Sequence, residues 1–563
     1  MRRMPEADVH FSVAIVGAGV AGALLAHELA RAGHRVLLVE AGPAGRARVD
    51  LVGDYALAAV KTPRSSYRDN QPPSPVKSPD SEDDYAQTGP SKFKSTYLRR
   101  VGGSTWHMLG NMPRLVPADL RLHSRYGVGV DWPLGYDDLE PWYGEAEHAL
   151  GVAGDHRALD GLHGARRSRP FPMTRIWPSY GDLVVERAVV GLQVHGIPVE
   201  LISTPQARNS RPYDGRPACA GNSSCVPICP IGAKYDGSVH VRKAVAAGAV
   251  LWDRAVVTRI DLDRTTGRVR ALRYTRWDEA GARRKGSVAA DLYVVAAHAV
   301  ETPRLLLASR DPDAAPAGVA NGSDQVGRNL MDHLQGQGAT IVAEPLHPFR
   351  GPPTTVGIDC FRDGAFRARH AAFRLSIGND GMGRSETPYA ALGRLVDAGL
   401  IGTDLRTALR DRLSRQFRIS YSTEMLPRPG NRVTLADGPA DEFDVPRAEL
   451  AMTLDDYNRQ AFAKALAVVS AVFDRLGAPD GERKMQKEET YSGAGHIMGT
   501  TRMGQDPSNS VIDRDCRAHD HDNLFIVGAG AFPTGGTANP TLTVAALALR
   551  AARTVSTLLR TGP

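Results

Sequence analysis

The sequence lacks several features that would assign it to particular classes of protein. Five cysteines in 563 residues are an odd number, so we expect no disulfide framework. Aromatic residues make up only 6%, and no basic run carries interleaved aromatics, so the sequence does not predict nucleic-acid binding. A net charge of +7 over this length indicates a solvated, slightly basic surface.

Long apolar segments are also missing. The longest runs, such as residues 544–549, are far shorter than the ~18–20 residues that a membrane span needs, so we expect no transmembrane segment. Arg2 and Arg3 are not followed by the apolar region of a secretory signal. We therefore expect a cytoplasmic protein, or one that is exported only with a partner's signal. The length of the chain predicts two or more domains.

A glycine motif near the N-terminus predicts a dinucleotide site. A short apolar strand precedes Gly17, Gly19 and Gly22, which open a helix, and a second apolar strand ends in Glu40. In this motif the first glycine makes a tight turn, the second lets the backbone approach a pyrophosphate, and the third lets the helix pack on the strand. The helix N-terminus faces the phosphates, and Glu40 can accept the ribose hydroxyls.

The C-terminal tail predicts the reactive part of the same site. It carries two prominent polar side chains, His496 and Asn539, on either side of an apolar strand over 524–527. That strand runs into the turn Gly528-Ala-Gly530, and an alanine-rich helix follows from about Thr541. Because α/β sheets receive ligands where a strand ends in a glycine-rich turn, we expect the tail to close over the cofactor ring.

Other residues are expected to line the cofactor. Gly102-Gly103 stands before small hydroxyl residues, which permits close approach of the backbone to a flat ring. The complete set of expected cofactor contacts is Gly17, Gly19, Gly22, Glu40, Gly102, Gly103, Ser104, His107, Asn111, Val257, Gly528, Ala529, Asn539 and Thr541.

Three of the five cysteines lie close together in the sequence, as Cys219-x5-Cys225-x3-Cys229 with Pro230 after the last. Thiolates on a glycine- and proline-shaped loop are a common way to hold an iron–sulfur cluster, and three thiolates suffice for a three-iron cluster. The spacing alone leaves two interpretations open, a cluster or reduced structural cysteines.

The middle of the chain predicts two further features. Residues 60–95, rich in proline, serine and charge, predict a long irregular loop over the cofactor, with disorder as the alternative. Residues 249–309 alternate strands and turns and predict a return to the first sheet. The expected strands there are 250–253, 256–262, 269–274 and 292–295, followed by a helix over 305–309.

From residue 335 the pattern changes to strand-like pieces between polar turns, which predicts an antiparallel sheet that roofs the cofactor. Its expected strands are 340–343, 418–425 and 432–435, and a long helix is expected over about 454–476.

Taken as a set, these motifs resemble the glucose–methanol–choline (GMC) oxidoreductases, whose members bind FAD. The resemblance rests on the N-terminal glycine motif, the Gly102-Gly103 turn, the stretch 424–432 and the tail with His496 and Asn539. Within the family, the sequence is most similar to the catalytic subunits of bacterial FAD-dependent glucose, gluconate and fructose dehydrogenases. Its tail also resembles that of pyranose 2-oxidase.

The resemblance implies an α/β fold, with a Rossmann-like FAD-binding domain and a second α+β substrate domain built on an antiparallel sheet. The FAD-binding domain is expected at 1–334, with the loop 60–95 and a cysteine loop at 215–235, and parts of 155–205 fit either domain. The substrate domain is expected at 335–485. Residues 486–563 return to the FAD-binding domain and carry the catalytic pair.

The resemblance also implies a reaction. In such enzymes a histidine takes the proton of an alcohol while a hydride passes to flavin N5, and His496 matches that base. Asn539 matches the partner that hydrogen-bonds the same hydroxyl. The expected substrate is a secondary alcohol of a sugar, a glycoside or a sugar-like molecule. A histidine is a suitable base near neutral pH, which agrees with this assignment.

In the dehydrogenase subunits, a loop like that of Cys219, Cys225 and Cys229 holds a [3Fe-4S] cluster. This resemblance implies metal ligation by these residues and an electron exit to an external acceptor, such as a cytochrome, which favours a dehydrogenase. Those subunits carry a further cysteine, where this chain has Ala220, that ties them to a small accessory subunit. A covalent link to such a subunit is therefore not expected here.

His107 is ambiguous, because a histidine at the equivalent position of pyranose 2-oxidase bonds covalently to FAD. The residues 104–107 are closer to the dehydrogenases, so we expect non-covalent FAD.

Three alternatives stay open. An oxidase could act on the C2 or C3 hydroxyl of a sugar or glycoside and make hydrogen peroxide, and a light-driven decarboxylase would need an apolar tunnel. A non-catalytic electron-transfer subunit would not need His496.

Overall fold

The computed structural model describes residues 10–59, 66–67, 85–94, 97–348, 350–380 and 385–561. Most of the loop predicted at 60–95, and with it the expected cover over the cofactor, lies outside the described residues. Where the chain is described again, Tyr85–Thr88 forms strand β3 instead of an irregular segment.

Five parallel strands form the first sheet, in the order β22, β13, β1, β2, β9. Their bounds are Leu524–Ile526, Ala290–Val295, Phe11–Val16, Val36–Val39 and Val250–Trp252. The sequence predicted all five within two residues, because strands of a parallel sheet covered by helices read as short, continuous apolar runs.

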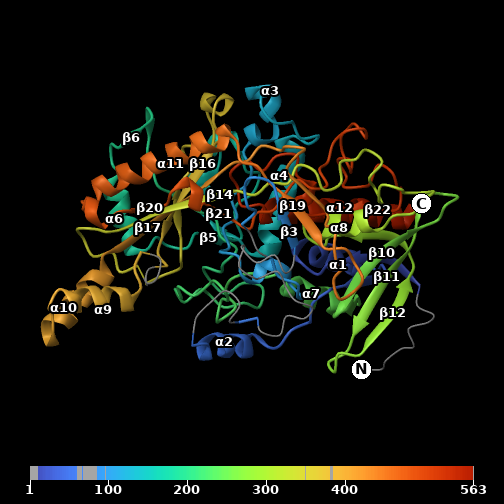
Figure 1. Cartoon of the computed structure of the whole chain (residues 1–563), viewed down its shortest axis with the longest axis horizontal. Coiled ribbons are helices and arrows are strands. Elements are labelled where there is room, and N and C mark those ends of the chain that lie inside the picture. The colour runs from blue at the N-terminus through green and yellow to red at the C-terminus, as the bar shows by residue number, and fades with distance from the viewer. Residues whose placement is uncertain are drawn as a thin grey trace.

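Helices cover this sheet. Helix α1 (Val20–Arg31) packs against α7 (Ser238–Ala246) and α12 (Thr541–Thr561), and α12 packs in turn against α4 (Tyr136–Leu150). By length and composition α12 could cross a membrane, but 61% of its apolar window is buried inside the protein. Its apolar side chains, among them Leu542, Leu547 and Val555, are buried and form part of the core. Figure 1 shows α12 on the side of the molecule that holds the first sheet, together with α8 (Glu301–Ala308), which follows β13 in the sequence.

The second large sheet is antiparallel, and Figure 1 shows it on the other side of the molecule. Its order is β20, β14, β17, β16, β15, β8, with β21 beside β14. The bounds are Lys484–Met485, Leu334–Ile341, Gln416–Thr423, Phe373–Gly378, Val356–Ile358, Ile202–Ser203 and Ser492–Gly493. Two of these strands, β8 and β21, lie outside 335–485, so the sheet draws on more of the chain than the predicted domain. The predicted domain boundaries stay a prediction.

Alternation along the central strands gives this sheet two different faces. Phe417 and Tyr421 of β17 point to α11 (Asp456–Arg475), where they contact Phe473 and Phe462. The intervening residues of β17 are only half-buried and polar. Because side chains alternate along a strand, one face packs on α11 and the opposite face is left for the cavity described below.

Two sequence predictions about sheets are wrong. Residues 432–435 form β18, but this strand pairs with β19 (Ala448–Ala451), which pairs with β3, and not with the large antiparallel sheet. Strands β10 (Ala255–Leu262) and β11 (Val269–Trp277) do not return to the first sheet. They are joined by a short loop, residues 263–268, and pair with each other in a separate three-stranded sheet with β12 (Arg283–Val288).

The remaining elements are short. The helices are α2 (Arg48–Leu57), α3 (Leu122–Tyr126), α5 (His156–Leu159), α6 (Tyr180–Ala188), α9 (Pro388–Asp397) and α10 (Gly402–Ser414). The strands are β4 (Ala153–Gly154), β5 (Met173–Thr174), β6 (Gln193–Val194) and β7 (Ile197–Pro198).

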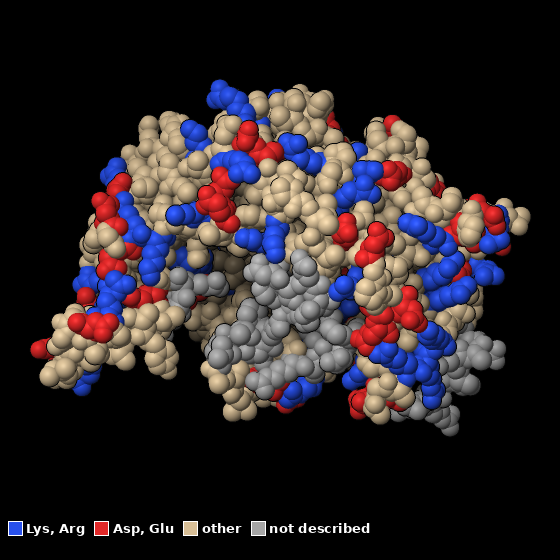
Figure 2. All heavy atoms as spheres, in the orientation of Figure 1, with Lys and Arg blue, Asp and Glu red and all other residues tan. Residues whose placement is uncertain are grey.

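The surface agrees with the small net charge. On the face shown in Figure 2, positive and negative side chains are interspersed over most of the molecule. The same face is hollowed beside the lobe from which α9 and α10 project in Figure 1.

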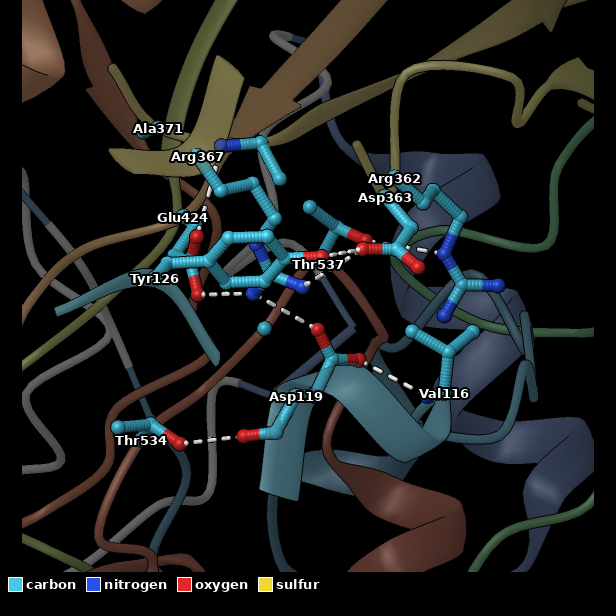
Figure 3. Close-up of polar contacts among 12 residues, drawn as sticks. Val116, Asp119, Tyr126, Arg362, Asp363, Arg367, Ala371, Glu424, Thr534 and Thr537 are labelled. Atoms are coloured by element: carbon cyan, nitrogen blue, oxygen red, sulfur yellow. Dashed lines mark hydrogen bonds and ion pairs between the residues drawn. The ribbon is translucent and has the colours of Figure 1, made fainter. Parts of the chain in front are cut away.

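A buried ion-pair network joins the 3-10 turn Pro117–Leu120, the end of β17 and the tail (Figure 3). Arg367 Nη2 lies 2.9 Å from a carboxylate oxygen of Asp119 and 2.7 Å from one of Glu424, and all three side chains are fully buried. The carbonyl of Asp119 accepts a hydrogen bond of 2.9 Å from Thr534, and Arg362 donates one of 2.9 Å to Thr537. The network therefore fixes the loop that leads to Asn539.

We predict that Arg367→Met lowers the free energy of unfolding by roughly 3–5 kcal/mol, because it leaves two buried carboxylates without their cation. Guanidinium unfolding followed by tryptophan fluorescence measures this loss. The control is Arg125→Met, which removes an exposed partner of Asp363 and should cost about 0–1 kcal/mol. Equal losses in the two variants would contradict the prediction.

Candidate functional site

A cavity of about 1060 Å³ lies between the carboxyl ends of the parallel strands and the antiparallel sheet. One end is lined by the N-terminal glycine motif and Glu40, and the other by β14 and β17. Ligands of open parallel sheets bind at this edge, and a dinucleotide needs an elongated space of this kind.

The glycine motif has the backbone geometry that a dinucleotide requires. Gly17 has φ +101°, and a side chain there would lie 2.5 Å from the carbonyl oxygen of Ala296. A side chain at Gly22 would lie 1.9 Å from the carbonyl oxygen of Gly17, so helix and strand could not pack. A Cβ at Gly19 would meet nothing within 4 Å, which leaves the backbone open to a ligand. The residues present thus fit FAD.

Glu40 directly follows β2 and lines the cavity wall. Its carboxylate accepts hydrogen bonds from the backbone N–H groups of Ala18 (2.8 Å) and Gly42 (2.9 Å). Burial raises the pKa of Glu40, and these two bonds oppose the rise. The carboxylate is therefore held in one orientation beside the glycine motif, where the ribose was predicted to bind.

Most of the predicted cofactor contacts meet at the cavity. Those that line it are Gly17, Gly19, Glu40, Gly103, Ser104, His107, Asn111, Val257, Gly528, Ala529, Asn539 and Thr541. Gly22 and Gly102 lie behind the wall instead of on it. Gly102 has φ +96° and donates its N–H to the carbonyl of Ala18, so it shapes the turn that Gly103 presents.

His107 follows this turn at the cavity wall. Burial, and after it the charges of Lys234 and His298, lower the pKa of His107 to about 4. Lys234 lies beneath the turn and donates to the carbonyls of Thr105, Trp106 and Met108. His107 is therefore a neutral imidazole, and its non-covalent relation to FAD stays a prediction.

The tail brings His496 and Asn539 together. Asn539 Nδ2 lies 2.9 Å from His496 Nε2, and both residues line the cavity. The backbone N–H of His496 donates to Asp332 (2.8 Å), which fixes the residue beside β14. Burial, followed by the charges of His333 and Arg374, lowers the pKa of His496 well below 6.5. The imidazole is thus a neutral proton acceptor.

Two further residues of this site were not predicted. His333 is one of them, and its Nδ1 lies 2.7 Å from Nδ1 of His496. Arg374 on β16 is buried and ion-paired to Asp359 at 3.0 Å, and its Nη1 lies 3.5 Å from Asn539 Oδ1. A charged residue in an otherwise apolar strand was the available sequence signal for Arg374.

Polar side chains of the antiparallel sheet line the far end of the cavity. Gln335 and Gln337 of β14 and Ser420 of β17 face it, and Gln337 lies opposite Ser420 in the strand register. Arg418 also lines it, with its guanidinium 2.7 Å from Asp380. This wall presents amide and hydroxyl groups together with a neutralised ion pair.

The cysteine loop lies beside the cavity. Cys225 and Cys229 are buried, Cys219 is half-buried, and all five cysteines of the chain are free thiols. Val226, next to Cys225, lines the cavity. Burial raises the pKa of Cys225. Within the described ranges, no three His, Cys, Asp or Glu side chains converge closely enough to hold a metal ion.

Family models match three parts of the chain. Residues 194–335 and 427–548 match two models described as GMC oxidoreductase, and residues 12–48 match one described as FAD dependent oxidoreductase. The match over 12–48 covers the glycine motif and Glu40, and the match over 427–548 covers His496 and Asn539.

Known proteins resemble the chain over its length. The fructose dehydrogenase large subunit of Gluconobacter japonicus is 37% identical over 99% of this chain and 100% of that protein. The 6'''-hydroxyparomomycin C oxidase of Streptomyces lividus is 31% identical over 98% of this chain and 92% of that protein. The crystal structure of pyridoxine 4-oxidase from Mesorbium loti matches with a TM-score of 0.64 and covers 97% of this chain and 99% of that chain. Its sequence is 20% identical, so this match shows the fold alone.

The glycine motif, the cavity and these matches lead to one assignment. The predicted resemblance is confirmed, and so is the predicted fold. The chain belongs to the GMC oxidoreductase family, as an FAD-dependent oxidoreductase that acts on CH–OH groups.

Proposed function

We propose that the protein oxidises a secondary alcohol of a sugar or sugar-like substrate, with His496 as the base and an external electron acceptor. The observation that carries this proposal is the neutral His496–Asn539 pair on the wall of a cavity whose far end is polar. The 37% identity to a fructose dehydrogenase large subunit supports a sugar as substrate and a dehydrogenase as the type of enzyme.

The chain's own residues would handle the proton. His496 Nε2 and Asn539 Nδ2 are hydrogen-bonded to each other, so a substrate hydroxyl that replaces this bond can donate its proton to the imidazole while the amide of Asn539 donates to the oxygen. When bound, FAD supplies the redox chemistry by accepting the hydride of the same carbon. The C–H electron pair leaves as hydride and the O–H proton goes to His496, which leaves a carbonyl group.

The far wall of the cavity supports a polyhydroxylated substrate. Gln335, Gln337 and Ser420 can each donate and accept hydrogen bonds, which suits several hydroxyl groups at once. Arg418 is paired with Asp380, while Lys484 of β20 also lines this part of the cavity and donates to the carbonyl of Ser385. The polar wall argues against the apolar tunnel that a fatty-acid decarboxylase needs.

We further propose that Cys219, Cys225 and Cys229 hold a [3Fe-4S] cluster. The support is that three thiols lie on one loop beside the cavity, and that such clusters are held by thiolates and carry single electrons. Among the described residues these thiols do not converge on a single metal-ion site, so the loop would have to close around a cluster. A cluster there would direct electrons towards an acceptor protein such as a cytochrome. The relative from Gluconobacter is named a large subunit, which supports a partner subunit for this chain too.

An oxygen-using oxidase is the second candidate. The relatives include the 6'''-hydroxyparomomycin C oxidase and a C-glycoside 3-oxidase of Arthrobacter globiformis, the latter 28% identical over 49% of this chain and 48% of that protein. Such an enzyme would use the same His496 and Asn539 for the alcohol, and would differ only in how the electrons leave.

The function is tested by anaerobic mixing of the holoenzyme with D-fructose, D-gluconate, a C-glycoside and 2-methyl-1,2-propanediol. We expect a sugar or glycoside to bleach the flavin absorbance fastest, and His496→Gln to slow this bleaching by about 10²–10⁴-fold, the usual share of a general base. The control is His521→Gln, a buried histidine bonded to Gly267 and Ala320. Unchanged bleaching in His496→Gln excludes His496 as the base.

Oxygen is then admitted to the reduced enzyme. Slow reoxidation by oxygen together with fast reoxidation by a dye is the result expected of a dehydrogenase. Fast reoxidation by oxygen with release of hydrogen peroxide would instead establish the oxidase.

The pH dependence follows from the environment of His496. A lowered pKa means that the neutral base persists as the solution is acidified through pH 6.5, so kcat/KM should stay level there and fall only at lower pH. The groups that face His496 are His333, Arg374 and Asp332. Stopped-flow bleaching across pH 4–8 measures the profile. An acid limb centred at or above pH 6.5 would show that the base is not held in this environment.

The cluster is tested by iron and acid-labile sulfide analysis and by electron paramagnetic resonance of the purified protein. We expect about three irons per FAD, and loss of iron in Cys219→Ser, Cys225→Ser and Cys229→Ser. Cys360→Ser and Cys516→Ser are matched controls, since these thiols lie outside the loop. Flavin without iron in the unmodified protein removes the cluster from the proposal.

A further inference from the structure

We infer that His333 is a positioning residue that fixes the tautomer of His496. The lone pair on His333 Nδ1 keeps the proton of His496 on its Nδ1, and so turns the lone pair of His496 Nε2 towards Asn539 and the cavity. This inference rests on the proposed role of His496 as the base.

The two imidazoles form a chain of three hydrogen bonds. His333 Nε2 lies 2.9 Å from the carbonyl oxygen of Gly536, and His333 Nδ1 lies 2.7 Å from His496 Nδ1. His496 Nε2 lies 2.9 Å from Asn539 Nδ2. The rings meet edge to face, with an interplanar angle of 82°. Each ring nitrogen of both histidines therefore has one partner.

Only one arrangement of protons gives every hydrogen bond in this series a donor and an acceptor. A carbonyl oxygen can only accept, so His333 Nε2 carries the proton and donates to Gly536. Burial lowers the pKa of His333 to about 4, so its Nδ1 has no second proton and must accept. His496 Nδ1 then carries the proton of the neutral imidazole, and its Nε2 is left with the lone pair.

The hydrogen bonds of Asn539, at the opposite end of this series, agree with this assignment. Arg374 Nη1 lies 3.5 Å from Asn539 Oδ1, and a guanidinium can only donate, so Oδ1 accepts. This turns the NH₂ group of Asn539 to His496 Nε2, which must then be an acceptor. Two residues on opposite sides of His496, His333 and Arg374, thus lead to the same tautomer.

The carbonyl that starts the chain is itself held in place. Gly536 has φ +52°, and a side chain there would lie 2.5 Å from the carboxyl carbon of Asp119. Thr534 and Thr537, on either side of it, bond to Asp119 and Arg362 in the network of Figure 3. The buried network therefore sets the position of the Gly536 carbonyl and, through His333, the tautomer of His496.

The same chain suits the protonated state. When His496 takes the substrate proton, its Nδ1–H bond to the neutral acceptor His333 becomes charge-assisted and stronger. Without His333, the Nδ1 proton would lose its partner, and only the amide of Asn539 would still disfavour the tautomer with the proton on Nε2. A histidine with its proton on Nε2 cannot accept one from the substrate.

The test compares His333→Leu, which removes the acceptor, with His333→Asn, whose Oδ1 can still accept from His496. In holoenzyme labelled with ¹⁵N-histidine, we expect a downfield resonance of His496 Nδ1–H that is present in the unmodified protein and in His333→Asn. It should be absent in His333→Leu and in His496→Gln. This readout needs no substrate.

Flavin bleaching by D-fructose, or by the fastest of the four probes above, gives the second readout. We expect His333→Leu to slow bleaching by at least about 10²-fold, at equal flavin content and with oxidation of the reduced enzyme by dye unchanged. His333→Asn should stay within about 10-fold of the unmodified enzyme. His521→Leu, another buried histidine with two hydrogen bonds, should lose stability but keep its bleaching rate per flavin.

The outcomes separate the two proposals. If the resonance and the bleaching rate both survive in His333→Leu while His496→Gln is slow, the role of His333 is overturned and His496 remains the base. If His496→Gln bleaches at the normal rate, the proposed function fails instead. Equal losses in His333→Leu and His333→Asn also overturn the inference, because a purely structural role would not discriminate between them.

Discussion

A polar group that is withdrawn from water must find a partner inside the protein, and the arrangement around His496 follows from that constraint. His333 and Asp332 are buried, and each has a partner that leaves little freedom, the carbonyl of Gly536 and the backbone of His496. An unpaired buried donor or acceptor costs about 1–3 kcal/mol. Any orientation of these side chains that breaks one of the bonds is therefore disfavoured. What remains is one geometry, in which Nε2 of the imidazole that faces the cavity is unprotonated and accepts from Asn539.

The two sheets contribute in different ways to that geometry. The parallel sheet supplies the edge at which Gly17, Gly19 and Glu40 can hold a dinucleotide. The antiparallel sheet supplies a wall whose outer face packs on α11 and whose inner face is polar. Neither sheet makes the site alone. The buried contacts of Arg367 with Asp119 and Glu424 join the turn Pro117–Leu120 to the end of β17 in the antiparallel sheet.

The elements that were predicted correctly are those whose structure is determined by residues close together in the sequence. Helix α1 and strands β1 and β2 follow one another within thirty residues, and their apolar runs and glycines permit few other structures. Strand β14 begins at Leu334, six residues before its predicted start, because Gln335, Gly336, Gln337 and Gly338 have little strand propensity of their own. Burial against α11 decides its conformation. Strand β12, with the sequence RRKGSV, carries no apolar pattern at all and was not predicted.

For this protein the sequence by itself determined the dinucleotide motif, the parallel strands and the long helices, since each of these is carried by a short stretch of residues with a strong local pattern. The roles of His496 and Asn539 follow from the family resemblance and stay a prediction. Only the tertiary structure decided which strands pair, and that His333 and Arg374 join the site. The reason is physical: β18 pairs with a strand that itself pairs with β3, more than three hundred residues earlier, and His333 meets His496 across 163 residues. Contacts of that kind depend on how whole sheets are brought together, which no local pattern of residues encodes.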